Sequence, residues 1–225
     1  KLAAALGDLP LALDQAAALI EQTRISFADY LTKFETHWAD LLRSGRPSAD
    51  YPMSVTMSWE ISFRQVEEQA PSAAQILAIC AFLSPDNIPR GLLRDLAQYA
   101  PPGVGFVLGD PVACGEAIGQ LASFSLVDAA DVHVRMHPLA AGLARARLSE
   151  EEVRTWAGVA ARAMETAFKF DPANPMAWRG MGDLLPHALA AAGHADDAGV
   201  SPGSVRSIYN AAGQYLLAVA RFDEA

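Results

Sequence analysis

The stretch Val132-His133-Val134-Arg135-Met136-His137-Pro138-Leu139 changes its hydrophobic period within a few residues. Apolar and polar residues alternate as far as Met136, which predicts a strand. Val132, Val134 and Met136 would lie on one face of this strand, and His133 and Arg135 on the other. After Met136 the pattern becomes helical. The stretch therefore predicts a strand that runs into a helix through His137.

Three helices and a β-hairpin are expected around this stretch. The apolar spacing predicts the helices at residues 72–83, 89–99 and 111–123. Residues 100–109 are rich in proline and glycine and are predicted to form a loop. Short strands are predicted at residues 125–128 and 132–136, and three helices followed by a hairpin is the element order of a winged helix.

Winged helices often read DNA with their third helix, so the charge of residues 111–123 is informative. This segment contains Glu116, follows directly on Asp110, and has no lysine or arginine. The whole chain has 26 acidic and 17 basic residues, a net charge of −9. Such a field repels phosphate backbones. The charge pattern argues against nucleic acid as a partner and favours a winged helix used for packing or switching.

The first part of the chain is predicted to consist of stacked helices. Residues 10–22 have helical apolar spacing, and Ser26 followed by Asp29 is typical of a helix start. Residues 55–63 are ambiguous, because strict alternation favours a strand whereas the Val55, Trp59 and Phe63 stripe favours a helix. Good helix formers follow this segment, and we predict a helix.

The last third is predicted to form helical hairpins and the start of a repeat. A helix is expected at residues 149–170, where acidic residues follow Ser149, and another at 176–192. Residues 171–175 would form a hinge and 193–203 a polar loop. The final apolar pattern matches the first half of a tetratricopeptide repeat, with Gly213 allowing close helix packing. Its residues are Tyr209, Gly213, Leu216, Ala220, Phe222 and Ala225.

Composition places limits on the kind of protein. No apolar run approaches the about 20 residues of a membrane span, and no signal peptide is evident, so no membrane contact is expected. Cys80 and Cys114 lie in apolar helical patterns and are predicted to be reduced core residues of a cytoplasmic protein. The chain opens and stops inside helical patterns, and we expect it to be a piece of a longer polypeptide.

Two motifs and the terminal repeat occur in an order that resembles a known family. The stretch Gly7-Asp8-Leu9-Pro10-Leu11-Ala12-Leu13 is similar to the GLPLAL motif of NB-ARC proteins, and Met136-His137-Pro138-Leu139 is similar to their MHD motif. NB-ARC proteins are STAND-class signal-transduction NTPases. The resemblance covers essentially the whole chain, which looks like the C-terminal part of a member with tetratricopeptide repeats and without its P-loop domain.

The resemblance implies a mainly α fold in three parts. Residues 1–83 would form a helical, ARC1-like bundle. Residues 84–148 would form an ARC2-like winged helix with one small β-hairpin. Residues 149–225 would be a linker of helical hairpins leading into the tetratricopeptide-like array, whose surface would bind protein partners.

The resemblance also implies a nucleotide-dependent switch. ADP or ATP would be held together with an upstream P-loop domain. Pro10 would lie against the adenine, Leu9 would also contact the nucleotide, and His137 would contact the ADP β-phosphate. Asp8 is an insertion in the first motif and Pro138 replaces the aspartate of the second. The chain contains no G-x-x-x-x-G-K-[ST] sequence, so no catalysis is expected from it. Any ATPase activity would belong to the parent protein, and no nucleotide is expected to stay bound to this chain alone.

Other interpretations remain open. The chain could be a nucleotide-independent helical scaffold for protein partners, or a winged-helix transcription regulator. His137 could be a structural histidine at a strand end, Pro10 an ordinary helix-start proline, and His187 a packed helix residue. His133 and His137 lack the helical i, i+4 geometry that suits zinc, so no metal site is predicted.

Overall fold

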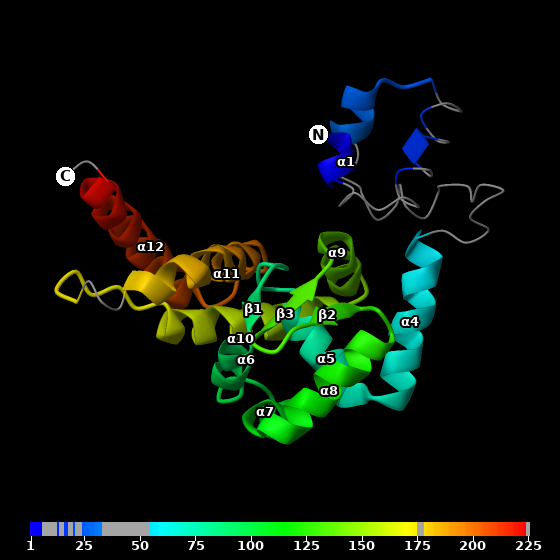
Figure 1. Ribbon diagram of the computed structural model, residues 1–225, viewed down its shortest axis with the longest axis horizontal. Helices are drawn as coiled ribbons and strands as arrows, with labels where there is room; N and C mark the ends of the chain where they lie inside the picture. Colours follow the sequence, from blue (N-terminus) through cyan, green and yellow to red (C-terminus); the bar gives the residue numbers. More distant parts are fainter. Residues whose placement is uncertain are drawn as a thin grey trace.

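The computed structural model describes residues 1–5, 13, 16, 17, 20, 24–32, 55–174 and 178–223. Over these residues the protein is mainly helical, with a small three-stranded antiparallel sheet near its centre (Figure 1). Residues 7–12 of the GLPLAL-like stretch, including Leu9 and Pro10, lie outside the described residues. A short helix, α1 (Leu2–Ala5), precedes them.

The ambiguous segment before Ala70 is a helix. Helix α4 (Val55–Gln69) ends directly before Ala70, and Pro71 opens helix α5 (Pro71–Cys80) at its first position. Proline tolerates this position because its missing N–H needs no helical partner there. The predicted helix is confirmed. Phe63 and Val66 of α4 are buried, and α4 packs on α5.

The sheet contains one strand more than the sequence suggested. Strands β1 (Ile88–Pro89), β2 (Val127–Ala129) and β3 (His133–Met136) pair in the order β1-β3-β2. Val134 pairs with both Ile88 and Ala129. Strand β1 is not predictable from the sequence pattern, because two residues are too few to show a hydrophobic period. Its Pro89 also falls within the helix predicted at residues 89–99.

Burial along β3 follows the predicted alternation in part. Val134 and Met136 are buried, and Arg135 is exposed. Val132 breaks the pattern, because its side chain is 64% exposed and it lies before the strand. Its carbonyl instead accepts a hydrogen bond from the Arg90 N–H. The prediction that Val132 shares the buried face was therefore wrong.

The predicted loop at residues 100–109 is mostly helix. Helix α6 (Arg90–Leu96) is followed by α7 (Pro102–Gly109), which has proline at its first position and buries Val104 and Leu108. A Cβ on Gly105 would lie 2.6 Å from the Ala97 carbonyl oxygen, so glycine is needed for this close approach. The proline and glycine content predicted a loop. Here Pro102 starts a helix, and Gly105 lets that helix approach Ala97 closely.

Helix α8 (Pro111–Ser123) has its predicted bounds. The Asp110 carboxylate caps it by accepting hydrogen bonds from the N–H groups of Val112 and Ala113, at 2.8 and 3.0 Å. Its buried face carries Cys114, Ile118 and other apolar residues. Cys80 and Cys114 are both free and buried, as predicted. Burial raises the pKa of the Cys80 thiol to about 12, so it stays uncharged at neutral pH.

The helices of the last third depart from their predicted bounds, the first being shorter and the second longer than predicted. Helix α9 (Pro138–Ala146) leads to α10 (Glu150–Ala167), α11 (Trp178–Asp197) and α12 (Pro202–Asp223). Residues 193–197 continue α11, so the first half of the predicted polar loop is helix instead. Ala195 is buried and keeps that turn packed, while Asp196 and Asp197 are exposed. Gly199, with φ of 64°, then ends the helical run.

One buried core connects these elements. It extends from Phe63 of α4 through Val134 of β3 to Ile208 of α12. Helices α10, α11 and α12 pack on one another at one end, and α4 lies at the opposite end beside α9 (Figure 1). This core crosses both expected domain boundaries, at residues 83/84 and 148/149, and the three-part division remains a proposal.

We predict that Ser149→Ala destabilises the protein by about 1 kcal/mol, the typical value of a helix N-cap. Ser149 and Glu152 form a capping box at the start of α10: the Ser149 Oγ accepts from the Glu152 N–H at 3.3 Å, and the Ser149 N–H donates to the Glu152 carboxylate at 2.9 Å. Urea denaturation measures the change. Ser207→Ala, at an exposed position within α12, is the matched control and should change stability by less than about 0.5 kcal/mol. Equal effects of the two substitutions would contradict the capping role.

Candidate functional site

His137 lies at the junction between β3 and α9, as the sequence predicted. Strand β3 ends at Met136, and His137 is the N-cap residue of α9, with Pro138 at the first helical position. Its Nδ1 accepts a hydrogen bond from the Leu139 N–H at 3.2 Å. Pro138 has no N–H to offer, so the imidazole caps the first helical N–H that faces it. The proline that departs from the MHD motif is therefore compatible with the helix start.

This contact determines which ring nitrogen carries the proton. A nitrogen that accepts a hydrogen bond holds a lone pair, so in the neutral imidazole of His137 the proton is on Nε2. Nε2 is then a hydrogen-bond donor. The side chain is half-buried, with one edge committed to the backbone of α9. A phosphate or carboxylate oxygen is the kind of group that such a donor can bind.

A surface pocket of about 460 Å³ lies beside His137. This volume is within the range of roughly 300–1,000 Å³ that is usual for small-molecule sites. The pocket is formed where the end of α8 meets β2 and β3. Its lining residues are Ala122, Ser125, Leu126, Val127, Asp128, Arg135 and His137.

The charges at this pocket are mixed. Arg135 lies 3.6 Å from the Asp86 carboxylate and donates to the Asn87 amide oxygen at 3.3 Å. Asp128 lies directly opposite Arg135 on the neighbouring strand. A guanidinium and an imidazole N–H favour an oxoanion, whereas the Asp128 carboxylate repels one. Without a further source of positive charge, this pocket is weakly suited to a polyphosphate.

The other histidines of the described region lie away from this pocket. His133 and His187 line a second pocket, together with Asp86 and Asp183. His187 is 1% exposed on α11, and its Nε2 lies 3.3 Å from the Asn87 carbonyl oxygen, to which it donates. His187 is thus a packed helix residue, as expected. No group of three or more metal-binding side chains occurs among the described residues.

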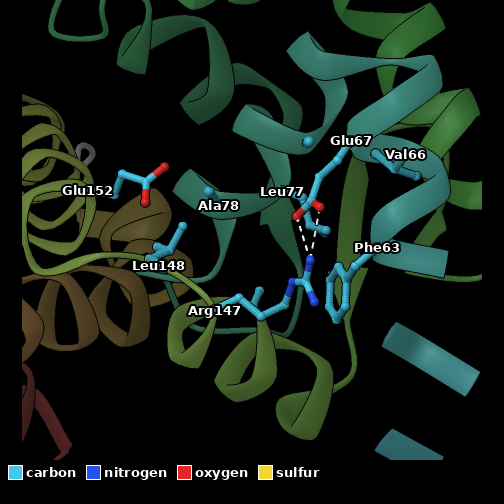
Figure 2. A pocket seen from close by; sticks show the side chains of 10 residues that line it. Phe63, Val66, Glu67, Leu77, Ala78, Arg147, Leu148 and Glu152 are labelled. Carbon is cyan, nitrogen blue, oxygen red and sulfur yellow. Dashed lines mark hydrogen bonds and ion pairs between the residues drawn. The ribbon is translucent and has the colours of Figure 1, made fainter. Parts of the chain in front are cut away.

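A second cluster, absent from the sequence predictions, joins α4 to the C-terminal end of α9. The Arg147 guanidinium lies 2.5 Å from the Glu60 carboxylate and donates to both Glu67 oxygens, at 2.8 and 2.9 Å. It also lies 5.3 Å from the centre of the Phe63 ring. Figure 2 shows Arg147 pointing toward Glu67 with the Phe63 ring beside it. This arrangement is stronger than an ordinary surface pair because one half-buried guanidinium is held by two carboxylates at once.

The Arg147 cluster is structural in character. The cavity beside it measures about 100 Å³, which is too small for a nucleotide. Burial opposes the charge of Arg147, but its hydrogen bonds to the Glu60 and Glu67 carboxylates outweigh this effect and raise the pKa of the guanidinium. The spacing of Glu60, Phe63 and Glu67 on one helical face was the available signal. Sequence spacing alone cannot pair that face with Arg147, which lies 80 residues after Glu67.

Two surface properties bear on possible partners. Helix α8, which would be the DNA-reading helix of a winged helix, has no basic residue and exposes Val112. Within the part of the chain that the structure describes, no helix is long and apolar enough to cross a bilayer.

Comparison with known proteins finds a distant relative. The chain is 31% identical over 138 residues to a nucleotide-binding leucine-rich repeat (NLR)-like protein of the fungus Hyaloscypha variabilis. The match covers 56% of this chain but 12% of the relative, so the chain corresponds to a small part of that protein. No family model matches, and no solved structure matches. The similarity supports a distant relationship to NLR-like signalling proteins.

Proposed function

We propose that this chain is the regulatory part of an NB-ARC, STAND-class nucleotide-dependent switch. An upstream P-loop domain of the same polypeptide would supply most contacts to ADP or ATP. The chain would close over the ADP-bound state through Pro10, Leu9 and His137, and ATP would favour the open state. The combination of the GLPLAL-like stretch, the MHD-like stretch and the NLR-like relative supports this proposal.

The observation that carries the proposal is the position of His137. Its Nδ1 accepts from the Leu139 N–H, so the neutral ring has its proton on Nε2, and the residue lines the pocket of about 460 Å³. An Nε2–H donor at the end of a strand is suited to a phosphate oxygen. The repulsion from Asp128 also fits the expectation that nucleotide binds poorly to this chain alone, because the upstream domain would provide the missing cations.

The arrangement of β1, β2 and β3 supports a winged-helix interpretation of residues 84–148. The first strand precedes α6, the other two follow α8, and the sheet order is β1-β3-β2. In this interpretation α6 and α8 are two of the three helices and β2–β3 is the hairpin. The first helix would be α5 (Pro71–Cys80), so the module would begin before the expected boundary at residue 84. Because α8 has no lysine or arginine, we propose that the module packs against other parts of the switch instead of reading DNA.

The outer face of α12 supports a role in protein contacts. The tetratricopeptide-like residues Tyr209 and Leu216 are 45% and 49% exposed, and neighbouring Leu217 is 63% exposed. A Cβ on Gly213 would meet nothing within 4 Å, so no described helix makes the close approach that was predicted there. An apolar stripe at helical spacing is thus left facing solvent, as an interface with a further helix requires.

A nucleotide-independent scaffold is the second candidate. The same apolar stripe on α12 favours it, since protein binding through that face requires no nucleotide. The N-cap contact of His137 also gives that residue a structural purpose without ADP. The two candidates differ in what they predict for nucleotide retention.

The test is His137→Ala in the longer protein that contains this chain and a P-loop domain. We expect ADP release to accelerate about tenfold, because a hydrogen bond to a charged group contributes about 1.5 kcal/mol or more. Release of a fluorescent ADP analogue by stopped flow measures the rate. His137→Asn is the companion variant, since asparagine is also a good N-cap and separates loss of the cap from loss of the phosphate donor.

His133→Ala is the matched control, because His133 lines the other pocket and should leave ADP release unchanged. An unchanged rate in His137→Ala would remove His137 from the site. If the longer protein bound no nucleotide at all, the scaffold would be the better description.

A further inference from the structure

A groove of about 610 Å³ lies on the outer face of α10. It shares no lining residue with the pocket beside His137. Helix α10 forms its floor. One wall is the segment 99–101 between α6 and α7, and the other is the segment 199–201 between α11 and α12. Three distant parts of the sequence thus converge here. We call this feature the α10 groove.

The charged residues that line the α10 groove are both arginines, Arg154 and Arg162. No acidic residue lines it, although the chain has a net charge of −9. Both side chains are exposed, and neither makes an ion pair or side-chain hydrogen bond with any residue in the described part of the chain. Glu150 and Glu151, one turn before Arg154, also form no ion pair with it.

Arg24, Arg94 and Arg206 resemble the two groove arginines in making no ion pair or side-chain hydrogen bond with the described residues, whereas five other arginines are engaged with carboxylates or carbonyls. These are Arg64 with Glu60, Arg90 with the Ala130 carbonyl, Arg135 with Asp86, Arg145 with the Ala81 carbonyl, and Arg147 with Glu60 and Glu67. Arg154 and Arg162 are thus two positive charges on one groove, two helical turns apart on α10, without a counterion among the described residues. Such a pair attracts a dianion more strongly than a single negative charge.

Glycine at position 158 shapes the floor between the two arginines. Arg154, Gly158 and Arg162 follow each other at intervals of one helical turn, so they lie on one face of α10. A Cβ on Gly158 would lie 3.5 Å from the Ser201 Oγ and 4.0 Å from the Arg162 Nη1. The guanidinium of Arg162 and the hydroxyl of Ser201 thus border the same small volume above the glycine. Thr155 adds a second hydroxyl to the lining.

We propose that the α10 groove binds a phosphate monoester. A guanidinium presents a planar fork of N–H donors that matches phosphate oxygens, and two guanidiniums with two hydroxyls can satisfy a dianion. The groove is larger than a bare ion needs, so the organic part of the ester would lie along the wall at Tyr99 and Pro101. The Tyr99 hydroxyl is hydrogen-bonded to the Thr166 Oγ1 at 2.6 Å, which fixes that wall to α10.

The phosphate could belong to a small molecule or to a phosphorylated side chain, and the experiment separates these sources. The 225-residue chain is titrated with glycerol phosphate, with an Ala-phosphoserine-Ala peptide and with the unphosphorylated peptide. Binding is followed through the arginine Nε–H signals in NMR spectra and by calorimetry. We expect both phosphate probes to shift the signals of Arg154 and Arg162, and the unphosphorylated peptide to shift neither. Tighter binding of the phosphopeptide identifies a phosphorylated side chain as the source, and tighter binding of glycerol phosphate identifies a small molecule.

Variants then assign the binding to the groove. Arg154→Gln with Arg162→Gln should weaken phosphate binding at least about tenfold, because each lost charge-assisted hydrogen bond corresponds to about that factor. Arg64→Gln, on α4 at the other end of the molecule, is the charge-matched control and should bind like the wild type. The substituted side chains are exposed, so equal urea midpoints will show that folding is preserved. Signals that respond to no phosphate probe, or a double variant that binds as tightly as the wild type, would overturn the proposal.

Discussion

Phe82→Ala is expected to lower the free energy of unfolding by about 3–5 kcal/mol, the range for removing a buried aromatic ring. Phe82 is 1% exposed and lies in the turn directly after α5. Its ring meets the His194 ring of α11 edge-to-face, with centroids 5.6 Å apart. Phe82 therefore joins two helices that are more than 100 residues apart in sequence. The alanine variant leaves a cavity at that contact that neither helix can fill without moving.

Urea denaturation followed by circular dichroism measures this change. The matched control is Phe106→Ala on α7, where the ring is 75% exposed and the loss should be less than about 0.5 kcal/mol. A single transition is expected in both variants, since the buried core is continuous. If Phe82→Ala lowers the free energy of unfolding no more than Phe106→Ala does, the Phe82 ring is not an important packing contact of the core.

The contrast between α4 and α7 shows what sequence patterns can predict in this protein. Helix α4 was predictable because Phe63 and Val66 repeat at helical spacing over a segment long enough to establish the period. Helix α7 was missed because the rules for proline and glycine are local. Pro102 starts a helix only because apolar Val104 and Leu108 have a core to enter, and Gly105 matters only through its contact with Ala97. Both reasons depend on tertiary structure.

The candidate site was predictable to the same limited extent. The change of hydrophobic period around His137 was sufficient to predict a strand–helix junction, which the structure confirms. The opposition of Asp128 and Arg135 was not predictable, because it depends on the register of a hairpin whose strands are only a few residues long. The predicted nucleotide contacts of Leu9 and Pro10 fall outside the described residues. For the α10 groove, the sequence contained Arg154 and Arg162 at helical spacing, but the walls come from elsewhere in the chain.

Acidification is expected to destabilise the protein mainly through His194. Burial lowers the pKa of His194 to about 4, and the nearby positive charge of Arg145 adds to the effect, while Asp197 opposes it. An unfolded histidine has a pKa of about 6.5, so between these two values the unfolded chain binds more protons than the folded one. Stability is therefore complete above about pH 6.5 and falls as the pH decreases toward 4. At about 1.4 kcal/mol per pKa unit, the full loss is about 3 kcal/mol.

His187 should contribute in the same direction. Burial lowers its pKa, as does the charge of His133, whereas hydrogen bonds to the Asn87 and Ser84 carbonyls and the charge of Asp183 oppose the shift. Its Nδ1 is buried and has no hydrogen-bond partner among the described residues, so this nitrogen is already desolvated in the neutral ring. Both histidines lie on α11, and their protonation should weaken the packing of that helix against the segment between α5 and β1, where Phe82 and Asn87 lie.

Unfolding free energies at pH 7.0, 6.0 and 5.0 test this expectation, because ordinary carboxylates remain largely ionised over that interval. The wild type should lose about 2 kcal/mol across it. His194→Gln should remove most of the slope, and His187→Gln together with His194→Gln should remove nearly all of it. A slope that survives both substitutions would mean that other groups cause the acid sensitivity. If His194→Gln removes the slope but also lowers stability at pH 7.0, the neutral ring contributes packing with Phe82 in addition to its titration, as its edge-to-face contact indicates.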